Sequence, residues 1–384
     1  MIPPGYKQTE VGVIPEEWEE KSIRSVCKLI NGRGFKPHEW KSNGLPIIRI
    51  QNLNGSEDFN YFEGPYAKKL EVENGQLLFA WSGSRGTSFG PHIWNGSLGL
   101  LNYHTWKVQV DGRSICTDFF LHALKQLTKF IEDRAHGASA LVHTQKWEME
   151  GFTFPMPPTT AEQRAIATAL SDVDGLLGAL DRLIAKKRDL KQAAMQQLLT
   201  GQTRLPGFKG EWVVKRIGDV VQIQKGQLIT SSTLIPGDIP VIAGGKQPAY
   251  YHASANRFGR TVTISASGAS AGYVALYDTP IFASDCSTIS ESESYCLDFV
   301  FYQLLCKQQA IYKAQTGGAQ PHIHAKDLNP IPFPMPPLPE QTAIAAVLTD
   351  MDAELAALEQ RREKTRALKQ GMMQELLTGR TRLV

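Results

Sequence analysis

Small and polar residues that could hold phosphate oxygens form two matching stretches, residues 82–88 and 265–270. Each stretch follows a predicted strand, and its small residues would expose backbone N–H groups and hydroxyls, which suit phosphate oxygens. A tight turn between strands favours the same residue types, so that interpretation stays open. The candidate phosphate contacts are Ser84, Arg85, Ser88, Ser265, Ser267 and Ser270.

Residues that could read base edges occupy corresponding strand-to-loop stretches in the two halves of the chain. Arginine pairs with guanine edges, and asparagine or glutamine with adenine edges, in the major groove of DNA. Taken singly, each candidate could equally be an ordinary surface residue. The candidates are Arg49, Gln51, Asn52, Lys246, Gln247 and Tyr250, and weaker ones after the first predicted strand of each half are Arg33, Lys36, Lys225 and Gln227.

No residue pattern typical of catalysis accompanies these candidates. The chain has no phosphate-binding P-loop, no Gly-x-Ser-x-Gly motif and no His-Glu-x-x-His motif. His322 and His324 could hold a metal ion on a strand, but no carboxylate or cysteine cluster accompanies them. We therefore predict no catalytic residue, no metal site and no cofactor bound by this chain itself.

The elements that would position the candidates come in two copies. Residues 162–205 and 340–383 are identical at 25 of 44 positions, at a constant offset of 178. A weaker echo upstream, at an offset of 194, matches Trp18 with Trp212 and Gly32 with Gly226. This is an internal repeat. Joining the chain's end to its beginning would recreate the central junction at 203–209, which predicts two equivalent halves around a pseudo-two-fold axis.

The repeated segments predict two long antiparallel helices of about 40 residues, each about 60 Å long. Their apolar residues recur in steps of four and three, a coiled-coil seam that resumes at Leu190 and Leu368. The repeat also preserves polar residues that a brace would not need, so we predict two copies of one docking site for a partner. The predicted seam and docking residues are Glu162, Gln163, Ile166, Leu170, Leu177, Leu180, Glu340, Gln341, Ile344, Leu348, Leu355 and Leu358.

The remaining regions predict β-rich domains, because short β-type runs are broken there by Gly, Pro, Asn and Ser. The fold class is thus α+β, with two β-rich domains separated by the two long helices. We place the β-rich domains at residues 1–156 and 207–337 and the helical segments at 157–206 and 338–384. Strands are expected at 45–53, 76–82, 103–110, 239–243, 261–266 and 273–277, and shorter helices at 119–132 and 298–314.

Composition narrows the class of protein only modestly. The net charge is +3, from 41 basic and 38 acidic residues, which is too even to indicate nucleic-acid binding by itself. No apolar run is long enough to span a membrane. The five cysteines lie far apart without a C-x-x-C pair, so we expect a reducing, cytoplasmic location.

The chain resembles the specificity subunits of type I restriction–modification enzymes. The duplicated helices ending in L-L-T-G-x-T-R-L carry the resemblance, together with the stretches at 5–18 and 44–53. The resemblance implies that each β-rich domain is a target recognition domain for one half of a bipartite, asymmetric site in double-stranded DNA. It implies that the helices set the spacing and dock two methyltransferase subunits, and that motor subunits complete the nuclease. S-adenosylmethionine, ATP and Mg²⁺ would then belong to the partner subunits, and this chain would not be an enzyme.

Two alternatives stay open on the sequence. Lectin-like β domains on a coiled-coil rod would make a two-headed interaction scaffold, and a stand-alone DNA modification protein would be an enzyme. Salt-dependent DNA binding seen only with a partner would favour the specificity subunit over the scaffold. Methyl transfer by the purified chain alone would favour the enzyme.

Overall fold

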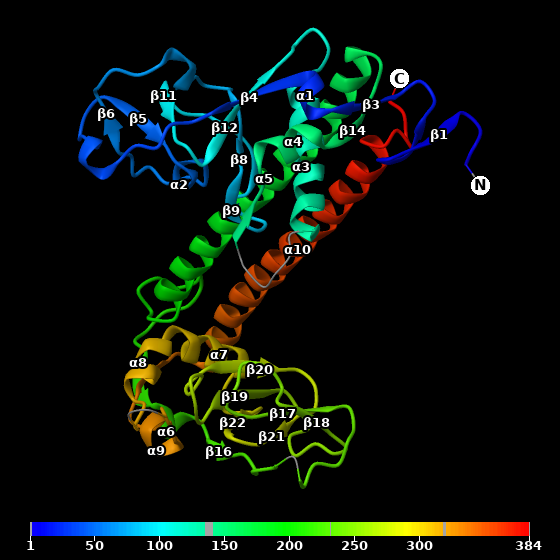
Figure 1. The fold of residues 1–384 in the computed structure, drawn as a ribbon. Helices are drawn as coiled ribbons and strands as arrows, with labels where there is room; N and C mark the ends of the chain where they lie inside the picture. Colours follow the sequence, from blue (N-terminus) through cyan, green and yellow to red (C-terminus); the bar gives the residue numbers. More distant parts are fainter. Residues whose placement is uncertain (1, 135–140, 231, 318–319, 384) are drawn as a thin grey trace. The chain divides into compact units, whose positions relative to one another are not determined.

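The computed structural model describes residues 2–134, 141–230, 232–317 and 320–383 (Figure 1). The chain divides into two compact units, one formed by Met1–Ala179 with Arg362–Val384 and the other by Leu180–Arg361. The long helices α5 (Thr160–Leu198) and α10 (Leu338–Leu376) each contribute one half to either unit. Each unit is therefore a β-rich domain joined to the first half of one helix and the second half of the other.

A four-stranded antiparallel sheet forms the centre of the first domain, in the order β10-β8-β12-β4. Phe79 and Trp106 on neighbouring strands stack with their ring centroids 6.0 Å apart. Phe119 and Phe120 of helix α3 are buried in the same hydrophobic cluster, so the helix covers this sheet. The elements are β4 (Cys27–Asn31), β8 (Leu77–Ala80), β10 (Gly90–Ile93), β12 (Thr105–Val110) and α3 (Thr117–Arg134).

A smaller sheet with the order β6-β5-β11-β7 completes the first domain, and its strands β5 and β11 run parallel. Successive residues of a strand point to opposite faces. Ile47 and Leu100 accordingly belong to one buried cluster, and Ile48 and Leu101 to another. Burial on both faces explains why these strands read as continuous apolar runs. The elements are β5 (Leu45–Ile48), β6 (Tyr61–Phe62), β7 (Glu71–Val72) and β11 (Gly99–Leu101).

The second domain repeats this plan with one strand fewer in its smaller sheet. Its larger sheet has the order β16-β22-β19-β20, and its smaller sheet, β18-β17-β21, again contains one parallel pair, β17 with β21. The structure thus confirms the internal repeat that the sequence predicted. The elements are β16 (Gln224–Lys225), β17 (Ile239–Ile242), β18 (Tyr250–His252), β19 (Thr261–Ser265), β20 (Val274–Tyr277), β21 (Phe282–Ala283) and β22 (Cys286–Ser290).

Short elements complete the two units. Strand β3 pairs with β14 and β9 with β13 in the first unit, β15 pairs with β23 in the second, and β1 with β2 forms a hairpin near the start of the chain. The strands are β1 (Tyr6–Thr9), β2 (Gly12–Pro15), β3 (Glu19–Ser22), β9 (Ser82–Ser84), β13 (Leu141–His143), β14 (Thr153–Met156), β15 (Val213–Arg216) and β23 (Pro332–Met335). The helices are α1 (Ile23–Val26), α2 (Ile50–Leu53), α4 (Lys146–Gly151), α6 (Ile217–Val220), α7 (Leu297–Cys306), α8 (Gln308–Lys313) and α9 (Ala325–Leu328), with 3₁₀ turns at Pro37–Glu39 and Lys68–Leu70.

The halves of α5 and α10 pack antiparallel within each unit. In the first unit Lys369 reaches Asp174 at 2.5 Å, and in the second Lys187 reaches Glu354 at 2.7 Å. Most predicted seam residues are buried, and Leu177 and Leu358 are half-buried. The predicted resumption of the seam was wrong at its first position in both helices, because Leu190 is 48% and Leu368 60% exposed. The buried seam residues are Ile166, Leu170, Leu180, Ile184, Ile344, Leu348 and Leu355.

Some of the predicted elements also required correction. The stretch 45–53 is not one strand, because β5 ends at Ile48 and the chain turns into α2. The Asn52 side chain accepts a hydrogen bond from the Arg49 backbone N–H at 3.0 Å, a local bond that competes with strand pairing. The predicted helix at 298–314 breaks at Lys307, whose ψ of 8° separates α7 from α8.

Candidate nucleic-acid interface

Strand pairing gathers the loops of the first domain at one end of its sheets. Thr105, at the start of β12, pairs with Ala80 at the end of β8, and the next residue pairs with the end of β4. The ends of β5 and β11 pair with each other. Arg33 and Asn102, just beyond β4 and β11, form a bridge that ties the two sheets together. The segments after β4, β5, β8 and β11 therefore start at the same end of the sheets, and the candidate residues of this domain lie on the segments after β4, β5 and β8.

The second domain gathers the corresponding loops in the same way. Cys286, at the start of β22, pairs with Ser265 at the end of β19, and the next residue pairs with Lys225 at the end of β16. The backbone N–H of Ser284 donates to the carbonyl of Ile242, at the end of β17, over 2.7 Å. The segments that sequence analysis matched between the two halves thus follow corresponding strand ends.

One glycine in each domain permits this convergence. A Cβ atom on Gly32 would lie 2.0 Å from the carbonyl oxygen of Asn102, and one on Gly226 would lie 2.0 Å from that of Ser284. The same glycines donate their N–H groups to the first residue of β12 and of β22, over 3.3 and 2.8 Å. Only a residue without a side chain allows such a close backbone approach. The repeated glycine therefore fixes the end of the domain where the candidates lie.

The residues after β5 have different roles in the structure. Asn52 is 6% exposed, and its amide donates to two carbonyl oxygens of its own loop at 3.0 Å each. With both amide hydrogens used, Asn52 shapes the loop and has none left for an adenine edge. The Arg49 guanidinium lies 5.4 Å from the centre of the Trp40 ring, and Gln51 is exposed. Arg49 and Gln51 remain the base-edge candidates of this stretch.

Arg33 is engaged within its own domain. Its guanidinium forms an ion pair with Glu39 and lies 4.8 Å from the ring centres of both Phe35 and Phe62. These contacts account for its charge without a ligand. Lys36 is exposed on the same loop, so it is better placed than Arg33 for a phosphate contact.

The glycine- and serine-rich loop of the first domain is partly closed by its own hydrogen bonds. The buried Ser88 hydroxyl accepts the backbone N–H of Ser84 at 2.7 Å, and the Gly86 N–H donates to Glu132 at 2.8 Å. The tight-turn interpretation therefore accounts for Ser88. Ser84 is half-buried in β9, and Arg85 is exposed.

In the corresponding loop of the second domain, hydroxyl groups are likewise bonded within the domain. The Ser265 hydroxyl is buried, 3.4 Å from the carbonyl oxygen of Gly245, and the Ser267 hydroxyl donates to the Asp285 carboxylate. Ser270 is half-buried. The hydroxyls of Ser265 and Ser267 thus have partners within the domain and stabilise its fold.

The base-edge candidates of the second domain lie on the surface. Lys246, Gln247 and Tyr250 are exposed in the stretch after β17 and at the start of β18. Lys225 and Gln227 are exposed at the end of β16. These five side chains are in a position to meet a ligand at this end of the domain.

Sequence analysis missed an aromatic group at the same end of the first domain, because it assigned residues 103–110 to one strand. The strand begins at Thr105, and Tyr103 and His104 form a turn before it. Their ring centroids lie 3.7 Å apart, and the Trp81 indole donates to the Tyr103 carbonyl at 2.9 Å. Burial lowers the pKa of His104, which favours a neutral ring at this surface. The adjacent aromatic residues Tyr103 and His104, at the edge of a predicted strand, were the sequence signal that could have revealed this group.

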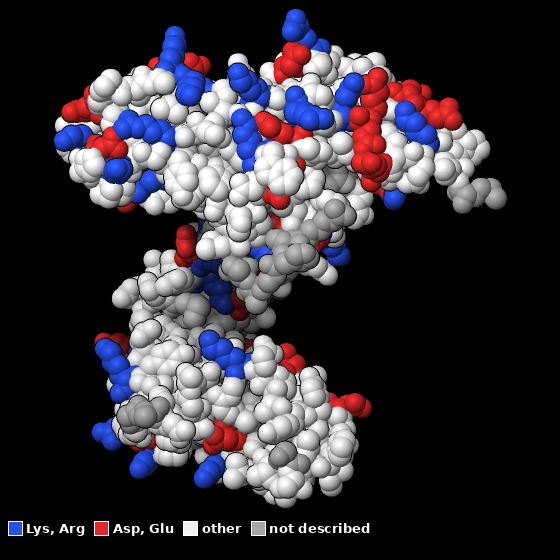
Figure 2. Space-filling model, in the orientation of Figure 1, with Lys and Arg blue, Asp and Glu red and all other residues white. Residues whose placement is uncertain are grey.

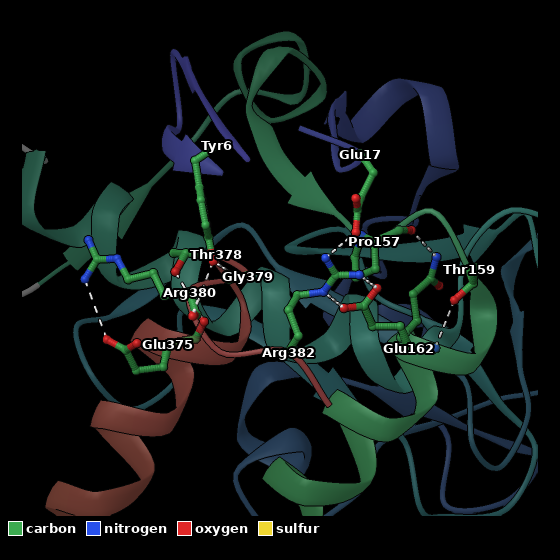
Figure 3. A network of polar contacts seen from close by, with 11 residues as sticks. Tyr6, Glu17, Pro157, Thr159, Glu162, Glu375, Thr378, Gly379, Arg380 and Arg382 are labelled. Atoms are coloured by element: carbon green, nitrogen blue, oxygen red, sulfur yellow. Dashed lines mark hydrogen bonds and ion pairs between the residues drawn. The ribbon is translucent and has the colours of Figure 1, made fainter. Parts of the chain in front are cut away.

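The repeated polar residues at the start of α5 lie inside the first unit (Figure 3). Glu162 is 1% exposed, and the Arg382 guanidinium pairs with it and with Glu17. Gln163 is equally buried, and its side chain accepts the backbone N–H of Cys116 at 2.8 Å. Because both side chains are enclosed, the prediction that they form an exposed docking face was wrong.

The second unit repeats these contacts and the same correction. Arg204 donates to the two carboxylate oxygens of the buried Glu340 at 2.5 and 2.6 Å. Gln341 accepts the backbone N–H of Cys296 at 3.0 Å. The repeat therefore preserves these four residues to fasten each domain to its helices. The signal that could have shown this is the repeated Thr-Arg-Leu after each helix, which supplies Arg204 and Arg382.

Burial suppresses the ionisation of two cysteine thiols. Burial raises the pKa of the Cys27 and Cys286 thiols to about 12, so neither is a thiolate near neutral pH.

Over the described ranges no three His, Cys, Asp or Glu side chains are arranged to hold a metal ion. In the same part of the chain, no helix has the length and apolar character needed to cross a membrane. On the face drawn in Figure 2, basic and acidic side chains are interspersed.

Comparison with known proteins gives a consistent result over nearly the whole chain. A family model described as "Type I restriction modification DNA specificity domain" matches residues 15–186 and again 209–367. The chain is 25% identical over 422 residues to the type I restriction enzyme MjaVIII specificity subunit of Methanocaldococcus jannaschii, covering 96% of this chain and 94% of that protein. The crystal structure of a type I restriction–modification S subunit from M. genitalium shares the fold, with a TM-score of 0.66, 17% identity and coverage of 97% and 98% of the two chains.

Proposed function

The chain belongs to the family of type I restriction–modification DNA specificity proteins, and on this premise we propose that each β-rich domain reads one half of a bipartite, asymmetric DNA site. One observation carries the proposal. The same loops converge at the same end of both domains on a framework fixed by Gly32 and Gly226, yet the side chains on those loops differ. A shared framework with different side chains suits two different half-sites.

The long helices would set the spacing of the half-sites and dock two methyltransferase subunits. Since Glu162, Gln163, Glu340 and Gln341 are enclosed, the docking face must use other repeated residues. Two repeated glutamine positions are exposed in both helices and are candidates for it. They are Gln192 with Gln370 and Gln196 with Gln374. Two copies of one surface fit two copies of one partner.

The chemistry of the complex would belong to the partners. We infer that methyltransferase subunits bring S-adenosylmethionine and that motor and nuclease subunits, joined through the complex, bring ATP and Mg²⁺. The inference is supported by the family to which the chain belongs. This chain would then supply recognition without catalysis.

A domain exchange tests whether each domain recognises its own half of the DNA site. Residues 15–155 are replaced by the first domain of another family member, and methylated sites are mapped for the variant chain assembled with its methyltransferase partner. One half of the methylated site should change while the other half stays the same. A change in both halves would contradict recognition by separate domains.

A further inference from the structure

The turn that leads into the larger sheet is held by the same backbone hydrogen bonds in both domains. We call residues 102–104 and 284–285 the entry turns. The backbone N–H of the first residue, Asn102 or Ser284, donates a hydrogen bond to the backbone carbonyl of the last residue of β5 or β17. The distances are 3.2 Å in the first domain and 2.7 Å in the second. The backbone carbonyl of the last residue, His104 or Asp285, accepts a hydrogen bond from the backbone N–H of the residue after β8 or β19. The distance is 3.2 Å in both domains. The backbone position of the turn is therefore shared, at the end where the candidate loops converge.

The side chains on the entry turns are chemically different. The first domain has one extra residue, Tyr103, which is 46% exposed and lies against the ring of His104. The second domain instead presents Asp285, half-buried, with one carboxylate oxygen accepting the Ser267 hydroxyl. A constant backbone position with varied side chains is the arrangement that distinguishes a specificity residue from a framework residue.

The chemistry of Asp285 restricts what it could face on DNA. A carboxylate beside phosphates is repelled, so at a DNA-binding surface it needs a hydrogen-bond donor. In the major groove, aspartate accepts a hydrogen bond from the N4 amino group of cytosine. The bond from Ser267 orients the carboxylate and leaves an oxygen for such a donor. Tyr103 differs, because its hydroxyl both donates and accepts and carries no charge.

We propose that the entry turn is a base-reading element in both domains, in which Asp285 accepts a hydrogen bond from a cytosine amino group and the Tyr103 hydroxyl bonds a base edge in the other half-site. The proposal rests on the proposed function of the domains. It assigns base recognition to residues outside the loops that the sequence pattern singled out.

The substitution Asp285→Asn tests the cytosine contact. Asparagine keeps the shape and still accepts from Ser267, but its amide nitrogen opposes the cytosine amino group. We expect methylation mapping of the full complex to show that the preference for cytosine at one position of one half-site falls at least about fivefold. The other half-site should be unchanged. A loss spread evenly over all sequences would overturn the proposal.

The matched control is Glu291→Gln. Glu291 is an exposed acid directly after the other end of β22, so this variant removes the same charge away from the entry turn. Its base preference should equal that of the unmodified chain. If Glu291→Gln alters the same position as Asp285→Asn, the effect is one of net charge and the proposal is wrong.

Tyr103→Phe tests the other half independently, whatever the Asp285 variant does to folding. Phenylalanine keeps the ring contacts and removes only the hydroxyl, so one position of the other half-site should lose preference. If neither variant changes preference at a single position while the unmodified complex methylates a bipartite site, the role of the entry turn is refuted and the proposed function stands. If the unmodified complex methylates no such site, the proposed function itself fails.

Discussion

Arg204 and Arg382 show how one repeated residue can stabilise a buried charge. Each guanidinium meets both oxygens of a buried glutamate and lies 5.5 to 5.8 Å from the ring centre of a tryptophan, Trp212 or Trp18. A planar guanidinium can bond a carboxylate through two parallel N–H groups, which lysine cannot. We call this two-point contact between the guanidinium and the buried carboxylate the arginine fork. It explains why both copies of the repeat keep an arginine after the helix.

Removing the fork should destabilise the second unit. In Arg204→Ala the Glu340 carboxylate stays buried without its cation, and an unpaired buried charge is costly. We expect the melting temperature to fall by about 5 °C. Arg188→Ala is the matched control, since its ion pair with Glu359 is largely exposed and surface pairs contribute little. Equal melting temperatures for the two variants would show that the fork is not stabilising.

Arg49 and Lys246 can be tested as base contacts by substitution with alanine. A bidentate contact to a base edge should cost about 1–3 kcal/mol of binding and relax preference at one position. The readout is DNA binding by the assembled complex to sites that differ at single base pairs. An even loss over all sequences, with a shallower salt dependence, would instead mark a phosphate contact.

The local sequence pattern predicted the elements better than it predicted the site. The heptad spacing predicted α5 and α10, and short β-type runs predicted β8, β12, β19 and β20 of the larger sheets but neither β10 nor β22. The convergence of the loops depends on which strands pair, above all on the parallel pairs β5 with β11 and β17 with β21, and this pairing is not encoded in any single run. The heptad rule also assigns polar residues to the surface, so it could not show that Glu162 is buried by a residue 220 positions away.

The glycines of the framework can be distinguished from the glycines of the helices. Gly226→Ala would place a methyl group on the Ser284 carbonyl, and we expect it to lower the free energy of unfolding by about 1–3 kcal/mol or more. Gly175→Ala is the control, because nothing lies within 4 Å and the repeat already has Ala353 there. It should raise the free energy of unfolding by about 0.5–1 kcal/mol. Denaturant unfolding measures both, and a neutral Gly226→Ala would contradict the close approach.

Each unit takes its core from chain segments that are far apart in the sequence. Leu376 and Leu377, from the end of α10, are buried in the cluster that contains Trp18 and Leu170 of the first unit. In the second unit, the end of α5 is buried in the same way against the start of α10. A β-rich domain with only its own following helix therefore lacks part of its core and its arginine fork.

The fragment 1–206 should accordingly form a two-fold dimer. It contains the first domain and all of α5, but not the segment 362–384 that completes the first unit. Residues 184–206 are the repeat of residues 362–384, so the end of α5 from one copy can fill that place in the other. Arg204 would then pair with Glu162 of the second copy.

The energetic reason is the apolar surface that a monomer would leave in water. Each buried leucine is worth about 1.5–3 kcal/mol, and Leu198 and Leu199 match the buried Leu376 and Leu377. Light scattering should give the mass of a dimer, and Arg204→Ala should weaken it. With the methyltransferase partner, the dimer should methylate a palindrome made from the first half-site. A well-folded monomer of residues 1–206 would refute both the exchange of helix halves and the equivalence of the two units.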